Sequence, residues 1–252
     1  MDALCVTWNV LADRYSEPYR EIVDHSVLLW ENRLKTILKT ICRADVICLQ
    51  EIELNTFQSD FQSLFETHDF VSHVVSKKRS NPIGNVVLWR KRSFTLVESL
   101  TQSCAVHVLL ELPGSRIWIC NVHLKAGLKS GEPERINQIQ SCISNWKSRG
   151  SMRGIICGDF NDHMISGGSV REIIEKANFI VVDNQPRTAM IRDGQVFNFD
   201  HICSNGIKVT LHPSSIGDIC QNVRSDCGCF PKIPNVDNPS DHTPVFFMLK
   251  VN

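Results

Sequence analysis

The sequence has no long hydrophobic run and no excess of charge of either sign. None of its apolar stretches approaches the roughly 20 residues needed to span a bilayer, and the start of the chain lacks the basic region and apolar segment of a signal peptide. Its 27 Lys and Arg residues balance its 27 Asp and Glu residues, so no overall field attracts nucleic acid or membranes. We therefore expect no membrane partner, and any anionic substrate must be bound by a local site.

Cysteine is plentiful, but its pattern does not indicate disulfides. The chain has 11 cysteines, an odd number. Several lie in apolar, strand-like runs: Cys5, Cys48, Cys120 and Cys157. Buried free thiols behave as small hydrophobic side chains, so we expect an intracellular, cytoplasmic protein in a reducing compartment. Cys220, Cys227 and Cys229 could bind zinc, although their spacing fits no common zinc motif.

Short apolar runs typical of strands alternate along the chain with longer amphipathic segments typical of helices. Helices are predicted over residues 26–41, 57–68, 132–146 and 168–177. Strands are predicted over residues 3–8, 45–50, 70–75, 85–90, 94–100, 104–112, 116–122, 154–158, 179–183, 196–203, 207–211 and 243–251. No linker interrupts them, so we expect a single domain over residues 1–252, with two packed sheets and helices on the outside.

Polar and titratable side chains stand where the predicted strands stop. These residues are Asn9, Glu51, His123, Asp159 with Asn161, Asp200, and Asp241 with His242 just before the last strand. Gly, Asp and Asn are ordinary turn residues, so one such coincidence means little. Six in one chain are hard to explain as turns, and they predict a site on one rim of a sheet.

This set of residues suits metal-assisted hydrolysis of a phosphate ester. Mg²⁺ prefers one or two carboxylates together with water, and Glu51 is the natural ligand. Asp159 can orient and deprotonate the attacking water. Asn9 and Asn161 can donate hydrogen bonds to phosphate oxygens or hold that water.

His242 is the candidate for stabilising the transition state. A protonated imidazole would stabilise the charge that develops on phosphorus, with the metal on the leaving-group side. Adjacent residues on an extended chain point apart, so Asp241 is not its natural partner. We expect His242 to pair with a carboxylate elsewhere in the chain.

Six motifs resemble, in the same order, those of the endonuclease/exonuclease/phosphatase superfamily. They are TWNVLADRY, ADVICLQEIE, NVHLKA, GDFND, FDHI and NPSDHTP, and they extend from residue 7 to residue 244. A finer resemblance links NVLADRY, LLWENRL and ADVICLQE to the branch of carbon-catabolite-repressor-type deadenylases, nocturnin, angel and the 2′,5′-phosphodiesterases. The resemblance implies a four-layer α/β/β/α sandwich of the deoxyribonuclease-I-like type, with its site at one edge.

The resemblance also implies a role for each residue of the site. Glu51 would bind Mg²⁺, which Mn²⁺ could replace, and Asn9 would lie beside the metal. Asp159 would position the attacking water, and Asn161 would contact the phosphate.

The histidines and the remaining carboxylates have implied roles as well. His123 and His242 would hold the scissile phosphate. Asp200 and Asp241 match the other motif carboxylates, one of which would orient His242.

Three further residues would contact the substrate. Lys125 and Arg192 match positions that contact substrate phosphate in nocturnin-like proteins, and Asn85 replaces a small residue that faces the site. The segment before Asp200 is short and lacks the aromatic residue on which the deadenylases stack adenine. These last features leave the identity of the substrate open.

Three functions follow from this pattern. The first is a Mg²⁺-dependent phosphoesterase that hydrolyses RNA from the 3′ end, a 3′→5′ exoribonuclease with poly(A) as one candidate substrate. The second is a phosphatase or phosphodiesterase on a small nucleotide, such as the 2′-phosphate of NADP(H) or 2′,5′-oligoadenylate. The third is a binding module that has lost catalysis, against which the presence of Glu51 and Asp159 argues. The expected partner is RNA or an adenine-containing nucleotide.

Overall fold

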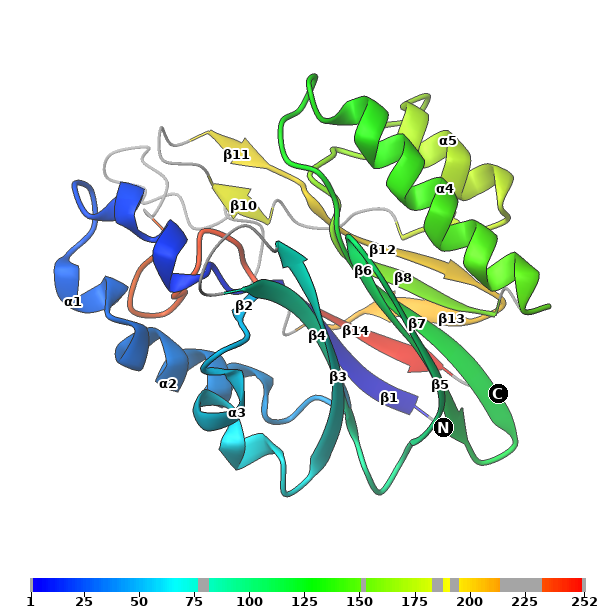
Figure 1. Ribbon diagram of the computed structural model, residues 1–252, viewed down its shortest axis with the longest axis horizontal. Helices are drawn as coiled ribbons and strands as arrows, with labels where there is room; N and C mark the ends of the chain where they lie inside the picture. Colours follow the sequence, from blue (N-terminus) through cyan, green and yellow to red (C-terminus); the bar gives the residue numbers. More distant parts are fainter. Residues whose placement is uncertain are drawn as a thin grey trace.

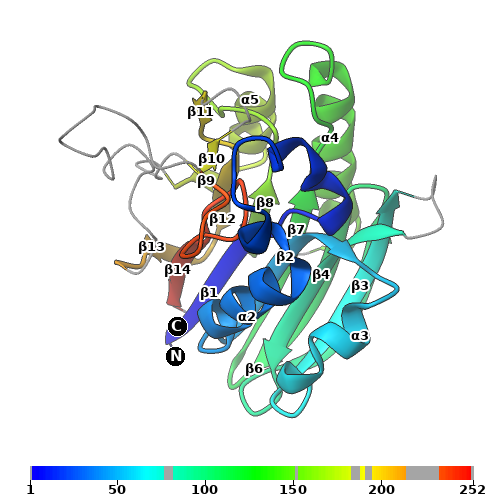
Figure 2. The same cartoon turned by 90° about the vertical axis from the view of Figure 1, so that its left-hand side faces the viewer.

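Two six-stranded sheets pack face to face, and helices cover their outer sides (Figure 1). The computed structural model describes residues 2–76, 82–150, 153–182, 188–190, 195–213 and 233–250. Figure 2 shows α2 and α3 outside one sheet and α4 outside the other. The fold is therefore the predicted four-layer α/β/β/α sandwich of the deoxyribonuclease-I-like type.

The first sheet contains the strands that carry Asn9 and Glu51. Its order is β13 (Lys208–Leu211), β14 (Val245–Lys250), β1 (Asp2–Asn9), β2 (Val46–Glu53), β4 (Ile83–Arg90) and β3 (His68–Ser76). β1 pairs antiparallel with β14 and parallel with β2. Parallel neighbours require a crossover, which here includes α1 (His25–Leu28) and α2 (Trp30–Ile41). Asn9 and Glu51 consequently reach the same edge of the sheet.

The second sheet repeats this arrangement. Its order is β5 (Thr95–Gln102), β6 (Ala105–Leu112), β7 (Ser115–His123), β8 (Gly154–Asp159), β12 (Asp200–Asn205) and β9 (Ile180–Val181). β7 and β8 are parallel and joined through α4 (Glu132–Ser148), whereas β12 runs antiparallel to β8. The register pairs Asp159 with both His123 and Asp200, so all three residues lie at one edge.

Apolar residues fill three layers because successive strand residues point to opposite faces. Between the sheets lie Ala3, Cys5, Val46, Cys48, Val106, Val108, Ile119, Ile155 and Cys157, among others. The outer faces of the sheets pack against α2 and α3 (Phe57–Asp60) on one side and α4 and α5 (Ser169–Lys176) on the other. The cysteines predicted in buried strands are indeed buried, and the described cysteines are all free thiols.

Buried amide groups interrupt the apolar layer between the sheets. Gln50 Nε2 in the first sheet donates to Asn121 Oδ1 in the second at 2.6 Å, and Asn121 Nδ2 donates back to Val86 O at 2.9 Å. Asn85 is fully buried in the same layer and donates from Nδ2 to Cys104 O at 3.0 Å. These bonds cross between the sheets and satisfy amide N–H groups whose burial without a partner is unfavourable, whereas Gln50 Oε1 and Asn85 Oδ1 are buried without a hydrogen-bond partner.

One predicted helix is replaced by shorter turns. Residues 57–68 form α3 (Phe57–Asp60) and the 3-10 turn η3 (Gln62–Leu64), and β3 already begins at His68. Helical backbone stops at Phe61, with φ −102° and ψ 12°. The aromatic residues of this segment, Phe57, Phe61 and Phe65, are spaced four apart and all pack against the first sheet. Side chains at this spacing can thus be buried on one face by consecutive short turns, and a single long helix is not required.

A short two-stranded ladder lies beside the last strands. β10 (Ala189–Met190) pairs with β11 (Val196–Phe197), and Ala189 also forms a β-bridge with His242. The strand predicted over residues 196–203 is thus divided, since β11 ends at Phe197 and β12 begins at Asp200. The ladder supports the backbone next to His242.

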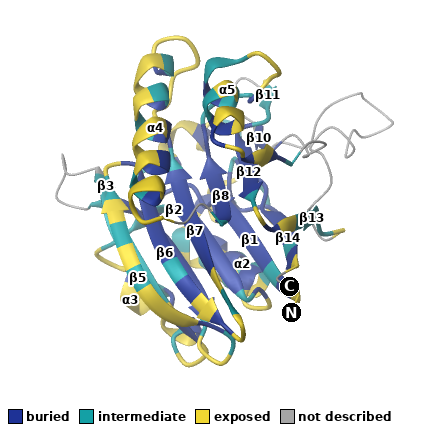
Figure 3. Cartoon of the chain, turned by 90° about the vertical axis from the view of Figure 1, so that its right-hand side faces the viewer, coloured by how far each residue is buried: buried dark blue, intermediate teal, exposed yellow. Residues whose placement is uncertain are grey.

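Exposed residues are concentrated on the outward faces of α4 and along β5, the edge strand of the second sheet (Figure 3). Within the described residues, none of the helices has both the length and the apolar character needed to cross a membrane.

Candidate active site

The side chains at the strand ends meet at one end of the sandwich. Asn9 ends β1, His123 ends β7, Asp159 ends β8 and Asp200 begins β12, while Glu51 lies near the end of β2. Asn9, Glu51, His123 and Asp159 are joined to one another by hydrogen bonds or close ionic contacts, and Asp200 is joined to Asp159 through His242. Residues from both sheets therefore form one site.

The Asn9 amide joins the two sheets at this site. Its Nδ2 donates to Glu51 Oε1 at 3.0 Å and to Asp159 Oδ2 at 3.1 Å. Its Oδ1 accepts a hydrogen bond from Leu11 N at 3.1 Å, which determines how the amide is turned. Both N–H groups are thus directed at carboxylates, one from each sheet.

Glu51 sits in an irregular part of β2. The pairing with β4 shifts register between Leu49 and Ile52, and Glu51 has φ 61°, a left-handed conformation that is uncommon outside glycine and is frequent at functional sites. Ala12 N donates to Glu51 Oε2 at 3.1 Å. Burial raises the pKa of Glu51; His123 opposes this rise and Asp241 adds to it.

Asp159 is the centre of the cluster. It is 2% exposed, and Asn161 N donates to its Oδ1 at 2.8 Å. Its Oδ2 lies 3.6 Å from His123 Nε2 and 3.7 Å from His242 Nε2, in addition to the Asn9 hydrogen bond. Two imidazoles and an amide therefore surround a single carboxylate oxygen.

His242 forms the ion pair that the sequence predicted with a distant carboxylate. Its Nδ1 lies 2.7 Å from Asp200 Oδ2, which confirms the prediction that its partner is not Asp241. Burial alone would lower the pKa of His242, but Asp200 and Asp159 outweigh burial and hold that pKa well above its ordinary value. The ring is therefore positively charged, with Nδ1 facing Asp200 and Nε2 facing Asp159.

Asn161 shapes the loop after β8. It has φ 48°, and its Nδ2 donates to Leu124 O at 3.0 Å, just after His123. In this arrangement its side chain links two loops of the second sheet. Contact with a phosphate stays a prediction for this residue.

Asp241 faces a residue that the sequence did not indicate. Tyr19 Oη donates to Asp241 Oδ2 at 2.6 Å, although 222 positions separate the two residues. Burial raises the pKa of Tyr19 and Asp241 raises it further, so the phenol keeps its proton. No local signal around Tyr19 reveals a partner so distant in the chain.

Two buried arginines hold the loops that follow β1 and β7. Arg33 of α2 donates from Nη1 to Val10 O at 3.1 Å and to Leu11 O at 2.8 Å. Arg135 of α4 donates from Nη1 to Lys125 O at 3.0 Å, and its Nε lies 3.3 Å from Asp162 Oδ2. Each arginine is 1% exposed.

The sequence contains a signal for Arg33. It occupies the same helical phase as the apolar residues Leu29 and Ile37, and a charged residue in that phase has to find partners inside the protein. Arg135 lies in the predicted helix 132–146, where no role was expected for it.

An aromatic group borders the site. His163, two residues after Asn161, stacks on Phe197 at a ring distance of 5.4 Å, and Phe197 stacks on Phe199 at 4.8 Å. Phe199 directly precedes Asp200, and Phe197 and His163 are partly exposed. The segment before Asp200 thus carries stacked aromatic side chains, and the absence of the aromatic residue on which the deadenylases stack adenine stays a prediction.

Among the described residues, two that were predicted to contact the substrate, Lys125 and Asn85, form no hydrogen bond or ion pair with the cluster. Lys125 is exposed on the loop after β7, where its backbone N donates to Gln138 Oε1 at 2.9 Å. Asn85 lies in the amide layer between the sheets, and its Nδ2 donates to backbone carbonyls there rather than facing the site. Arg192 lies outside the described residues, as do the three clustered cysteines, Cys220, Cys227 and Cys229.

A second group of metal-binding residue types lies beneath α4. One ligand atom from each of His107, Cys120 and Cys142 lies within 4.8 Å of the others. However, Trp146 Nε1 donates to His107 Nδ1 at 2.9 Å, which leaves the proton of the neutral ring on Nε2, the nitrogen facing Cys120. Burial lowers the pKa of His107 to about 4, so the ring is neutral near pH 7. A protonated ring nitrogen has no lone pair for a metal, and we assign this group to the core.

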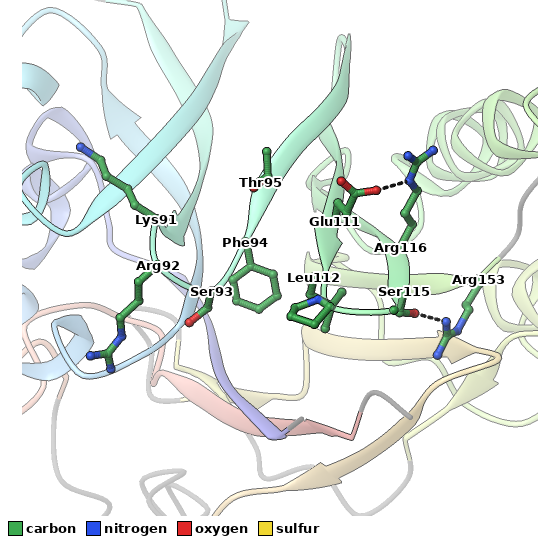
Figure 4. A pocket seen from close by; sticks show the side chains of 12 residues that line it. Lys91, Arg92, Ser93, Phe94, Thr95, Glu111, Leu112, Ser115, Arg116 and Arg153 are labelled. Atoms are coloured by element: carbon green, nitrogen blue, oxygen red, sulfur yellow. Dashed lines mark hydrogen bonds and ion pairs between the residues drawn. The ribbon is translucent and has the colours of Figure 1, made fainter.

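A hollow of about 880 Å³ lies at the other end of the sandwich, where β7 begins (Figure 4). Its lining includes Lys91, Arg92, Arg116 and Arg153. Figure 4 shows Lys91 and Arg92 pointing away from Arg116 and Arg153, and Arg116 Nε is paired with Glu111 at 2.8 Å. The cationic groups do not converge on one point, so the hollow lacks the geometry of a phosphate site.

The sequence and the fold have counterparts among known proteins. The model of the Endonuclease/Exonuclease/phosphatase family matches residues 6–242, and the chain therefore belongs to this family. The predicted resemblance is confirmed, and family membership makes the chain a hydrolase of the phosphoesterase class. Among curated proteins, no sequence is significantly similar to this one.

Solved structures share the fold over almost the whole chain. One is of ANGEL2, a 2′,3′-cyclic phosphatase, in complex with adenosine-2′,3′-vanadate, with 17% identity, 99% of this chain and 95% of that chain covered, and a TM-score of 0.79. Another is the human Nocturnin catalytic domain with bound sulfate, with 20% identity, coverage of 99% and 93%, and a TM-score of 0.71. An endonuclease/exonuclease/phosphatase from Bacteroides vulgatus has 17% identity, full coverage of both chains and a TM-score of 0.72. The branch predicted from the motifs is thus represented among these structures.

Proposed function

We propose that the chain is a divalent-cation-dependent phosphoesterase that hydrolyses RNA from its 3′ end. This proposal rests on one observation: Asn9, His123 and a charged His242 surround the carboxylate of Asp159. A carboxylate that can accept a proton and two imidazoles that can bind a phosphate are the groups that attack on a phosphodiester requires.

The residues around Glu51 fit a hard cation such as Mg²⁺. The oxygens that could bind it belong to two carboxylates, Glu51 and Asp241, which are close enough that the charge of Asp241 raises the pKa of Glu51. A divalent cation would offset this repulsion. Glu51 would hold it, with Asp241 and Asn9 beside it. When bound, the cation would polarise a phosphate oxygen and neutralise charge on the leaving group.

The chain's own residues perform the remaining steps. Asp159 holds the attacking water and accepts its proton at a carboxylate oxygen. His242 binds a phosphate oxygen through Nε2–H, and Asp200 keeps its ring charged and oriented through Nδ1. His123 faces the same oxygen of Asp159 and binds the phosphate from the second sheet.

The aromatic group supports a substrate that carries a nucleobase. Phe197 and His163 are partly exposed beside Asp200, and stacking of a base on such rings stabilises binding by about 1–3 kcal/mol per base. Lys125 and Arg192 are proposed to contact substrate phosphates. Because stacking tolerates any base, we place no preference on the terminal nucleotide.

Hydrolysis of a 2′,3′-cyclic phosphate at an RNA end is a second candidate. It is favoured by the similarity to ANGEL2, for which that chemistry is stated, at a TM-score of 0.79. The same groups would act, since a cyclic phosphate is also a diester attacked by water at phosphorus. A small nucleotide such as NADPH or 2′,5′-oligoadenylate would present a similar phosphate to the site.

One panel assay, run with Mg²⁺ and with EDTA, separates these functions. The substrates are 5′-labelled oligoadenylate, mixed-sequence RNA, the same RNA ending in a 2′,3′-cyclic phosphate, 2′,5′-oligoadenylate, single-stranded DNA and NADPH. We expect a Mg²⁺-dependent ladder that shortens RNA from its 3′ end. Opening of the cyclic phosphate without shortening would support the second candidate, and release of phosphate from NADPH alone would indicate a small-nucleotide enzyme. Turnover that persists in EDTA would exclude the cation.

A further inference from the structure

Tyr19 is the main hydrogen-bond donor to Asp241. Its hydroxyl lies 2.6 Å from Asp241 Oδ2, a length typical of an O–H group that donates to a charged carboxylate. The ring is 6% exposed and packs with Leu11 and Leu28. The hydroxyl is therefore held in place by its apolar surroundings and not only by its partner.

The other oxygen of Asp241 is less engaged. Ser240 Oγ lies 3.3 Å from Asp241 Oδ1, but the Ser240 hydroxyl has a closer acceptor in Asn9 O at 2.7 Å. A carboxylate offers about four acceptor positions, so Oδ1 keeps lone pairs for another ligand. Tyr19 thus anchors one oxygen of Asp241 and leaves the second available.

Glu51, Arg33 and His242 are charged groups that interact electrostatically with this pair. The charge of Asp241 acts on Glu51, and that of Glu51 acts on Tyr19. Arg33 Nη1 is occupied by the backbone carbonyls of Val10 and Leu11 and donates no hydrogen bond to Asp241. Asp241 is therefore a second carboxylate near Glu51, and the charge of Arg33 acts on both, although neither accepts a hydrogen bond from it.

We propose that Tyr19 is a positioning residue for the cation site, where its hydroxyl holds Asp241 beside Glu51 so that both carboxylates face one divalent cation. This inference rests on the proposed function, because that function supplies the cation. It concerns the orientation of Asp241 and assigns Tyr19 no part in proton transfer. The loss of such an outer hydrogen bond typically weakens metal affinity by about 10- to 100-fold.

Calorimetric titration with Mn²⁺, in the absence of any substrate, tests the proposal. The variants are Tyr19→Phe, which removes a single oxygen, and Tyr15→Phe, which makes the same change at an exposed position on the preceding turn. We expect Tyr19→Phe to bind Mn²⁺ at least about 10-fold more weakly than the native chain and Tyr15→Phe to bind it equally well. Glu51→Gln serves as the positive control, since it should lose binding.

Fluorine NMR supplies a second measurement on the otherwise unchanged chain. Tyr15 and Tyr19 are its two tyrosines, so labelling with 3-fluorotyrosine gives two resonances, which Tyr15→Phe assigns. Addition of Mg²⁺ should shift the Tyr19 resonance and leave that of Tyr15 in place. This experiment decides the question if Tyr19→Phe does not fold.

The outcomes distinguish this inference from the proposed function. Equal Mn²⁺ affinity of Tyr19→Phe and the native chain, or a Tyr19 resonance that Mg²⁺ does not move, would overturn the role of Tyr19 even if RNA is hydrolysed. Weaker Mn²⁺ binding by Tyr19→Phe, in a protein that turns over no substrate of the panel, would support the role of Tyr19 and reject the proposed function.

Discussion

The two sheets share one plan but supply different chemistry. In the first, the strands run in the order β14-β1-β2-β4, and in the second in the order β6-β7-β8-β12. Each series contains an antiparallel pair, then a parallel pair joined through a helix, then another antiparallel pair. Each crossover helix carries one buried arginine, Arg33 or Arg135, that binds backbone carbonyls of the loop after its strand.

The halves differ at the carboxylate that each contributes. Glu51 lies within an irregular strand at φ 61° and faces the proposed cation. Asp159 ends a strand whose register is unbroken, directly after Gly158, where φ is 138° and a Cβ would lie 2.0 Å from Val122 O. The shared frame therefore determines where a side chain emerges, whereas local backbone conformation determines which way it points.

The largest expected effect is loss of hydrolysis when either carboxylate is neutralised. We expect Glu51→Gln and Asp159→Asn each to lower kcat/KM by about 10³-fold, because one loses a cation ligand and the other a general base. Raising Mg²⁺ should restore part of the activity of Glu51→Gln and none of that of Asp159→Asn. Steady-state kinetics over a Mg²⁺ series measures this, and an identical response of both variants would contradict the division of roles.

Substitution of either buried arginine should destabilise the protein by a similar amount. We expect Arg33→Met and Arg135→Met each to lower the free energy of unfolding by about 2–4 kcal/mol, since several buried carbonyls lose their donor. Urea unfolding gives the values. Arg20→Met, which removes an exposed ion pair with Glu17, should change the free energy by less than about 1 kcal/mol. If only one of the two arginine substitutions lowered stability, the arginine–carbonyl bonds would stabilise only one of the two sheets and its loop.

The ion pair between His242 and Asp200 should determine the alkaline limb of the pH–rate profile. Asp200 raises the pKa of His242, so the active imidazolium is present below that raised pKa and is lost as pH rises through it. We expect Asp200→Asn to move the alkaline limb to lower pH, and His242→Gln to reduce kcat by about 10²-fold. An alkaline limb that stays in place in Asp200→Asn would assign it to another group.

A smaller effect concerns acid stability in the second half. Burial lowers the pKa of His107 to about 4, so the unfolded chain binds a proton there at a higher pH than the folded chain. The contribution of this residue to stability is complete when the pH is above the pKa of His107 in the unfolded chain, and it falls as the pH drops below that pKa. Between pH 7 and pH 5 the loss is about 2 kcal/mol. His107→Gln, which keeps an acceptor for Trp146, should show a smaller acid dependence in urea unfolding at both pH values.

Residues at strand ends were predictable from the sequence, whereas their supports were not. An apolar run that stops at Asn9 or Asp159 marks a rim by itself, because strand and polar group are adjacent in the chain. Tyr19 and Asp241 are 222 positions apart, so nothing in the local sequence of either one indicates the other. Asn85 was expected to face the site, but the packing of the two sheets, which no local pattern encodes, places it between them.

The buried amides between the sheets have a consequence for which substitutions the site tolerates. An apolar interface alone tolerates small sliding, since dispersion contacts are weakly directional, but the hydrogen bond from Gln50 to Asn121 at 2.6 Å fixes one relative position of the two sheets. In that position Asn9 reaches a carboxylate on each sheet. Stability and alignment are thus separable properties, so a chain with leucine at these amide positions could remain folded and still lose the geometry of its site.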